Sequence, residues 1–290
     1  MAALSPPPQI VGEGVTNEAQ WTDWLRELRP PPLAMGAVLG TARRLVVVCP
    51  HPDDDVLACG GLLALHAAKK GACLVVAVTD GEASHQGDPT WTLDQVGQAR
   101  RLEHQRGLAR LGVDVRADHA TAVTALSTQW DVAASVGTAT EMPSAATVGD
   151  PASALIRLGL PDGQVAAHSS RLEQVLSALL KPEDCVVSTW SLDGHPDHEA
   201  TGAATARVCR RVQCHLLQAP VWMWHWAVPG DSRVPWHRLY ALPLPAEPLA
   251  LKNAALAEHV SQLAPRGQEP AVLGSAVRAR AWRAAEYFFL

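Results

Sequence analysis

The chain has 290 residues, 48% of them hydrophobic and 18% charged, and this balance excludes an intrinsically disordered protein. A net charge of −5 without a basic tract argues against nucleic acid as a partner. No apolar run reaches the length of a membrane span, and the N-terminus lacks the basic start and apolar core of a signal peptide. The six cysteines form no CxxC pair, which favours free thiols in a reducing compartment. We therefore expect a cytoplasmic protein without a transmembrane segment.

Strand-like and helix-like segments alternate along the chain. After a proline-rich arm, an amphipathic helix is predicted over 16–29, and the continuous apolar run at 45–49 is typical of a buried parallel strand. Further helices are predicted over 56–70, 93–111, 170–180, 199–212 and 249–262, and further strands over 74–79, 113–115, 185–190, 220–228 and 239–242. This alternation predicts an α/β fold, Rossmann-like, with a mostly parallel sheet flanked by helices.

The chain divides into two parts on this interpretation. Residues 1–42 form an N-terminal arm and helix, and residues 43–290 form one α/β domain with an expected insertion at about 117–155. The insertion stretch is rich in Ala, Thr, Val and Ser, has weak periodicity, and is long for a structureless segment inside a compact domain. We assign no function to it.

Two polar clusters directly follow predicted strands. PHPDDD occupies residues 50–55, after the strand at 45–49, and DGHPDH occupies residues 193–198, after the strand at 185–190. Ligands of open α/β sheets bind at the carboxyl ends of the strands, near the point where the strand order reverses. If the strand order is the common 3-2-1-4, the two strands are neighbours and the two clusters face each other across one crevice.

The residue types in these clusters are those that bind catalytic zinc. Such a site takes three protein ligands and leaves one position open, and His51, Asp54 and His198 could supply the three ligands. Either cluster alone could be structural, since acids near a helix start also complement the helix dipole. The two clusters together favour a metal site.

Three further groups remain beside this expected metal site. Asp53 is left free next to the ion, where a carboxylate is suited to act as the general base. His195 could stabilise the oxyanion of a tetrahedral intermediate or protonate the leaving amine. Asp197 could orient one of the histidines through a hydrogen bond.

These motifs resemble a known family. PHPDDD followed by CGG, TDGE at 79–82 and GHPDHEATG at 194–202 are similar to the motifs of the LmbE / PIG-L family of zinc-dependent N-deacetylases. That family includes the N-acetylglucosaminyl-phosphatidylinositol deacetylase and the deacetylases of mycothiol and bacillithiol synthesis. The resemblance covers about 43–215 and returns weakly at 252–262. It implies a Rossmann-like fold and hydrolysis of an N-acyl group, usually on an amino sugar.

The resemblance also implies roles for individual residues. It carries over the zinc ligands His51, Asp54 and His198, the base Asp53, the electrostatic or acid partner His195, and Asp197 as the group tuning that histidine. Arg100 and Glu103 match the Arg-x-x-Glu of the family, where the arginine could bind a substrate hydroxyl or phosphate; a solvated helix charge is the alternative. Asp162 matches an acidic position that contacts substrate. Asp55 departs from the pattern, because the family has Glu there.

Three tryptophans at 222, 224 and 226 recur with period two in the strand predicted at 220–228. They could form a platform for sugar rings, but a packed sheet face is favoured. His225 is expected on the opposite face, at the rim of the crevice. His104 and His259 have no partner pattern and are treated as ordinary.

The expected function is that of a metal-dependent hydrolase that uses Zn2+ or another divalent ion. It would remove an acyl group, with acetyl as the first candidate, from a small N-acyl amino sugar or glycoconjugate. Two alternatives stay open: a non-catalytic sugar- or nucleotide-binding module on the same fold, and a metal-dependent esterase. The sequence leaves the oligomeric state open.

Overall fold

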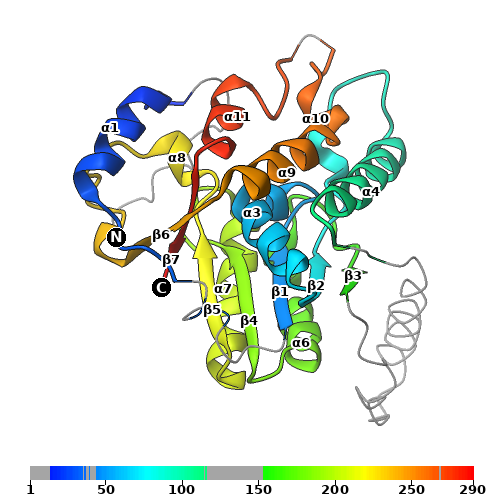
Figure 1. The fold of residues 1–290 in the computed structure, drawn as a ribbon. Helices are drawn as coiled ribbons and strands as arrows, with labels where there is room; N and C mark the ends of the chain where they lie inside the picture. Colours follow the sequence, from blue (N-terminus) through cyan, green and yellow to red (C-terminus); the bar gives the residue numbers. More distant parts are fainter. Residues whose placement is uncertain are drawn as a thin grey trace, which may run out of the picture.

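A seven-stranded sheet forms the centre of the molecule (Figure 1), in the order β3-β2-β1-β4-β5-β7-β6. This computed structural model describes residues 14–34, 36, 39, 44–113, 115, 153–267 and 269–290. The strands are β1 Arg44–Cys49, β2 Ala72–Ala77, β3 Ser153–Arg157, β4 Asp184–Thr189, β5 His215–Ala219, β6 Leu239–Pro243 and β7 Ala285–Phe289. Strands β1 to β5 are parallel, and β7 runs antiparallel to both β5 and β6. The predicted α/β fold and the 3-2-1-4 order are confirmed.

Helices cover both faces of this sheet. They are α1 Glu18–Leu28, α3 Asp54–Ala68, α4 Leu93–Arg110, α6 Ser169–Leu179, α7 Pro196–Val212, α8 Met223–Trp226, α9 Ala246–Ala257, α10 Val260–Leu263 and α11 Ser275–Ala281, with 3-10 turns η1 Glu82–His85, η4 Val165–His168 and η5 Trp236–Arg238. Within the described ranges, none of these helices combines the length and apolarity that a membrane span needs.

The central strand β1 shows why the sheet is buried on both sides. Side chains alternate between the faces of a strand, so Leu45 and Val47 pack with α3 and α9, whereas Val46 and Val48 pack with α6 and α7. The predicted apolar run therefore matches a strand with helices on both faces. Because β1 pairs with β4 in parallel, the loops that follow the two strands leave from the same edge of the sheet.

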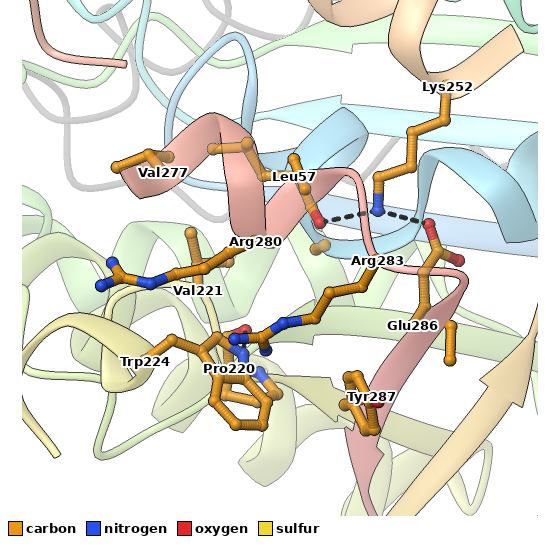
Figure 2. Close-up of a pocket in the computed structure, with 13 residues that line it drawn as sticks. Leu57, Pro220, Val221, Trp224, Lys252, Val277, Arg280, Arg283, Glu286 and Tyr287 are labelled. Atoms are coloured by element: carbon orange, nitrogen blue, oxygen red, sulfur yellow. Dashed lines mark hydrogen bonds and ion pairs between the residues drawn. The ribbon is translucent and has the colours of Figure 1, made fainter. Parts of the chain in front are cut away.

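Helix α3 carries the acidic cluster and is kinked at Cys59, where φ is −151° and ψ is 27°. The kink frees backbone groups, and a buried ion pair binds them (Figure 2). The Glu286 carboxylate accepts from the amides of Gly61 and Leu62 at 2.7 and 2.9 Å, while Lys252 Nζ donates to Glu286 at 2.7 Å and to the Leu57 carbonyl at 3.1 Å. The first turn of α3 is thereby held against α9 and β7.

The N-terminal helix forms as the sequence predicts. Asn17 caps it, because its side chain accepts from the Gln20 amide while the Gln20 side chain accepts from the Asn17 amide. Trp21 is fully buried and its ring centroid lies 5.0 Å from that of Trp224. Trp21 is therefore a packing group that anchors this helix to the rest of the chain.

Two predicted strands are wrong. Neither Val113 nor Val115 lies in a strand, and β3 is formed by Ser153–Arg157, which pairs with β2. Residues 153–155 of the expected insertion thus belong to the sheet, and the rest of that stretch lies outside the described residues. The strand predicted at 220–228 is replaced by a turn and the short helix α8, while the neighbouring segment His215–Ala219 forms β5.

Candidate active site

The acidic cluster forms a tight turn between β1 and α3. The amides of Asp53 and Asp54 both donate to the His51 carbonyl, at 2.9 and 3.3 Å. The Asp54 carboxylate folds back and lies 3.0 Å from the His51 amide and 3.1 Å from His51 Nδ1. This local folding puts an imidazole and a carboxylate side by side at the carboxyl end of the central strand.

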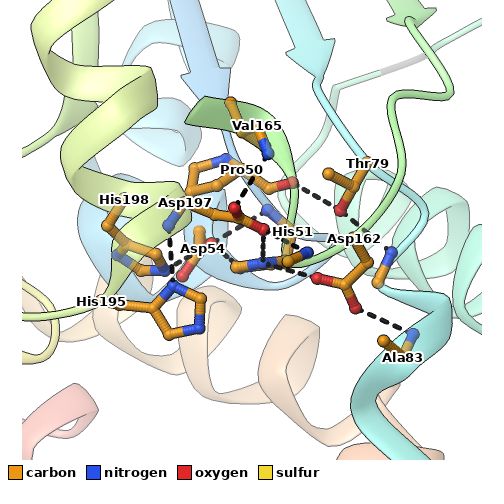
Figure 3. A network of polar contacts seen from close by, with 12 residues as sticks. Pro50, His51, Asp54, Thr79, Ala83, Asp162, Val165, His195, Asp197 and His198 are labelled. Carbon is orange, nitrogen blue, oxygen red and sulfur yellow. Dashed lines mark hydrogen bonds and ion pairs between the residues drawn. The ribbon is translucent and has the colours of Figure 1, made fainter. Parts of the chain in front are cut away.

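The second cluster meets the first from the loop after β4 (Figure 3). His195 caps the N-terminus of α7, and Pro196 and His198 are the first and third residues of the helix, in its first turn. His198 Nε2 is 3.2 Å from Asp54 Oδ2. The two clusters, distant in sequence, therefore face each other as predicted.

His51, Asp54 and His198 offer ligand atoms that all lie within 4.8 Å of one another, and all three residues are buried. His198 Nε2 has no hydrogen-bond partner among the described residues, although it is buried next to Asp54. A buried imidazole nitrogen of this kind requires an explanation, and a metal ion supplies one. Two imidazole nitrogens and a carboxylate oxygen form a donor set that fits zinc.

Each histidine of this set is oriented through its other nitrogen. His198 Nδ1 lies 2.8 Å from Asp193, whose carboxylate also accepts from the amides of Val221, Trp222 and Met223 at 2.9 Å each. Carboxylates only accept, so Nδ1 of His198 donates its proton to Asp193, and once the second ring proton is lost the Nε2 lone pair is available to an ion on the Asp54 side. Asp193 belongs to the polar cluster at 193–198, but its role as the partner of His198 was not predicted from the sequence.

The same arrangement recurs at His51. Its Nε2 lies 3.2 Å from Asp162 and 3.4 Å from Asp197, which leaves Nδ1 on the side of Asp54. The Asp197 carboxylate also accepts from the amides of Gly163 and Val165, at 2.7 and 3.1 Å. The Asp197 carboxylate thus contacts His51 and the 163–165 turn, whereas the Asp197 amide donates to His195 Nδ1 at 3.2 Å.

The pKa values show that this pocket attracts positive charge. Burial lowers the pKa of His198, but Asp54 and Asp193 outweigh burial and raise it to about 9. Burial likewise opposes protonation of His51, yet the neighbouring carboxylates, Asp162 first, raise its pKa well above the ordinary value. A divalent ion could replace these protons.

Asp53 lies beside the three possible ligands without belonging to their set. It is 4% exposed, and burial raises its pKa to about 6 against the opposing effect of the Arg100 guanidinium, which donates to it at 3.1 Å. Arg100 is itself buried and also donates to the Gly81 carbonyl at 2.8 Å, so the alternative of a solvated helix charge is wrong. Gly81 has φ +66°, and a side chain there would collide with Arg100.

His195 and Asp162 border a cavity of about 400 Å³ that opens over this cluster. Burial, His198 and His51 lower the pKa of His195 to about 3, so the ring is neutral at physiological pH. Since Nδ1 of His195 accepts the Asp197 amide, the ring proton is on Nε2. The Asp162 carboxylate accepts from the Ala83 amide at 2.9 Å, and Glu82 accepts from the Asp162 amide at 2.9 Å.

The three tryptophans do not form a platform for sugar rings, which was the less favoured alternative. Trp224 is buried against Trp21, Trp226 donates to the Asp193 carbonyl at 2.7 Å, and only Trp222 of the three borders the cavity. The predicted packing role is confirmed for Trp224. The prediction that the three tryptophans share one face of a strand is wrong, because Met223–Trp226 form the helix α8. His225, expected at the rim of the crevice, borders the cavity and is buried. The apolar wall opposite the polar cluster comes from 270–273, a segment that the sequence analysis left unassigned.

Two curated relatives bear the name 1D-myo-inositol 2-acetamido-2-deoxy-alpha-D-glucopyranoside deacetylase. The one from Tsukamurella paurometabola is 27% identical over 205 residues, covering 66% of this chain and 64% of that protein. The one from Corynebacterium diphtheriae is 26% identical over 246 residues, covering 76% of each. The chain thus spans slightly less than two thirds of the length of the Tsukamurella relative.

Solved structures share the fold. The conserved protein TT1542 from Thermus thermophilus superposes with a TM-score of 0.51 at 23% identity, over 84% of this chain and 93% of that one. The pseudoaglycone deacetylase Dbv21 superposes with a TM-score of 0.52 at 18% identity, over 85% of this chain and 97% of that one. The family described as PIG-L, GlcNAc-PI de-N-acetylase, matches residues 46–209, which is more than half of the chain. The chain therefore belongs to the PIG-L family.

Proposed function

We propose that this protein is a zinc-dependent deacetylase that hydrolyses the N-acetyl group of an N-acetylglucosamine-type amino sugar. The observation that carries the proposal is the buried set of His51, Asp54 and His198, whose ligand atoms lie within 4.8 Å of one another, with His198 Nε2 3.2 Å from Asp54. The family membership and the names of the relatives support the acyl-transfer chemistry. A cavity of about 400 Å³ is in the range of sites for small ligands.

His51, Asp54 and His198 would hold the ion. When bound, zinc polarises the amide carbonyl and lowers the pKa of water in the site. The donor set is also compatible with another divalent ion, and zinc is proposed because two imidazoles and one carboxylate with an open position are typical of catalytic zinc.

The chain's own residues would then move the protons. Asp53 takes a proton from the attacking water, and Arg100 keeps its carboxylate oriented by donating to it at 3.1 Å. His195, neutral and protonated on Nε2, donates to the carbonyl oxygen as negative charge develops there. Asp53 returns its proton to the departing amine.

Asp162 and Arg100 border the cavity and would bind substrate hydroxyls. Both side chains already have protein partners, Asp162 with Ala83 and His51, and Arg100 with Asp53 and Gly81. Their rotamers are thus fixed before a substrate enters, which lowers the entropic cost of binding. We also propose a cytoplasmic location, since all six cysteines, each within the described ranges, are free.

A substrate panel tests this function. The zinc-loaded protein is incubated with N-acetylglucosamine, its α-inositol glycoside and a matched O-acetyl sugar, and acetate and free amine are quantified. We expect release of acetate and amine in equal amounts from the N-acetyl sugars, and release slower by roughly 100-fold or more with the Asp53→Asn variant. Acetate from the O-acetyl sugar alone would mean an esterase, and no acetate from any sugar by metal-loaded protein would contradict the proposal.

A further inference from the structure

A second cluster of metal-ligating side chains lies beneath the active site, on the side of α4. It consists of Cys49 at the end of β1, Asp55 in the first turn of α3, and His104 in the middle of α4. The Cys49 sulfur, an Asp55 oxygen and a His104 nitrogen all lie within 4.8 Å of one another. The exposed fractions are 1% for Cys49 and 0% for Asp55 and His104, so the cluster is closed to solvent.

The Cys49 thiol donates to the Val76 carbonyl at 3.5 Å, but hydrogen bonds leave other polar atoms of this cluster without a partner. Asp55 Oδ2 and His104 Nε2 are 3.0 Å apart, but Asp55 Oδ1 and His104 Nδ1 are buried without a partner in the described parts of the chain. His259, between α9 and α10, is also fully buried, and both of its ring nitrogens lack a partner there. Its ring centroid is 6.5 Å from that of His104. Buried polar atoms in native proteins are nearly always bonded, so several unbonded ones in this cluster and on the neighbouring His259 indicate a missing ligand.

We propose that Cys49, Asp55 and His104 bind a second, structural metal ion, and that His259, which lies next to His104 but outside the set of atoms within 4.8 Å of one another, is the candidate fourth ligand. A thiolate, a carboxylate and two imidazoles form a four-donor set that favours Zn2+ or a similar thiophilic divalent ion. The thiolate and the carboxylate contribute two negative charges, which balance the two positive charges of the ion in a site without water. On binding, the Cys49 thiol and the Asp55–His104 pair each release a proton to solvent, and bonds from sulfur, oxygen and nitrogen to the metal replace them.

This site is separate from the catalytic one. The two sets of ligands have no residue in common, and none of Cys49, Asp55, His104 and His259 borders the catalytic cavity. Its ion would have no open position for substrate, as in structural zinc sites. It would tie β1, α3 and α4 together directly behind Asp54, the neighbour of Asp55 and a proposed catalytic ligand.

Cobalt substitution tests the proposal, because a thiolate bound to Co2+ gives an intense charge-transfer absorption that oxygen and nitrogen ligands do not. Wild-type protein, stripped and reloaded with Co2+, should bind two ions per chain and show this band. Cys49→Ser should bind one ion and lose the band. Cys185→Ser is the matched control, because Cys185 is a fully buried thiol on β4 outside the cluster, and this variant should keep both ions and the band.

The outcomes separate this site from the proposed catalytic site. His198→Ala should lose the catalytic ion but keep the thiolate band, whatever the activity of the protein proves to be. Uptake of a single ion per chain by wild-type protein, without a thiolate band, would overturn the second site, and that result needs no variant. A band that persists in Cys49→Ser would also overturn it.

Discussion

Replacing Asp53 by asparagine separates proton transfer from metal binding. Asparagine has nearly the same shape as aspartate, so it leaves no cavity, and its carbonyl oxygen can still accept the hydrogen bond from Arg100 that is 3.1 Å long in the parent. Asp53 lies outside the set of His51, Asp54 and His198, so the ion should remain bound. The change therefore removes the proton acceptor and little else.

The expected loss follows from the role of a general base. Positioned proton transfer contributes roughly 100- to 10,000-fold to a rate, which corresponds to about 3–5 kcal/mol of transition-state stabilisation. Asp53 is 4% exposed and its carboxylate already binds Arg100, so it contributes little to substrate binding in the ground state. The substitution should therefore lower kcat and leave KM nearly unchanged. Metal content should stay at the parent level.

The assay measures kcat and KM for amine release, together with metal content by elemental analysis, in the parent and in the variant. Asp80→Asn is the matched control, because Asp80 pairs with Arg101 at 2.6 Å and does not border the cavity. That control should retain the parent kcat. Parent-like turnover by metal-loaded Asp53→Asn would refute the assignment of the base, and loss of the ion in this variant would make Asp53 a ligand instead.

Three further changes test neighbouring parts of the structure. His198→Ala removes one of three metal ligands, so we expect both metal content and activity to fall sharply, and full metal occupancy in this variant would contradict the ligand set. Arg100→Met removes a cation that lowers the pKa of Asp53, so the Asp53 carboxyl should stay protonated to higher pH. The acid limb of the pH–rate profile should then shift to higher pH, and an unchanged acid limb would contradict the pairing of Arg100 with Asp53. Lys252→Met leaves Glu286 as an uncompensated buried charge, which should reduce the free energy of unfolding by about 3–5 kcal/mol in urea denaturation, and a reduction below about 1 kcal/mol would show that the pair contributes little.

The part of the site at the strand ends could be predicted because it follows from local patterns and one topological rule. Apolar runs mark β1 and β4, and parallel neighbours bring the residues after both strands to one edge of the sheet. His51 and His198 are 147 positions apart, yet this rule is sufficient to bring them together. The roles assigned to Asp53, His195 and Asp197 stay predictions.

Contacts from distant segments could not be predicted. The alternating tryptophans at 222–226 predicted a strand, but the Asp193 carboxylate accepts three successive amides at 221–223, and these amides are then not available to a strand ladder. Side-chain competition for backbone amides is a tertiary effect that periodicity does not contain. The predicted third strand failed for a related reason, since pairing with β2 is provided by Ser153–Arg157 and not by the residues that follow α4.

Asp55 is the position at which the motif departs from its family, and the fold explains why the departure leaves the metal set intact. Successive residues of a helix point about 100° apart, so in the first turn of α3 the carboxylates of Asp54 and Asp55 face different sides. Asp54 faces His198 across the crevice, and Asp55 faces His104 on α4, 3.0 Å away in a fully buried contact. A glutamate at 55 would need room for one more methylene in front of a buried imidazole, so the side chain at 55 and its partner on α4 constrain each other. The shorter acid is thus matched to a buried histidine behind the active site, and the three proposed catalytic ligands do not depend on it.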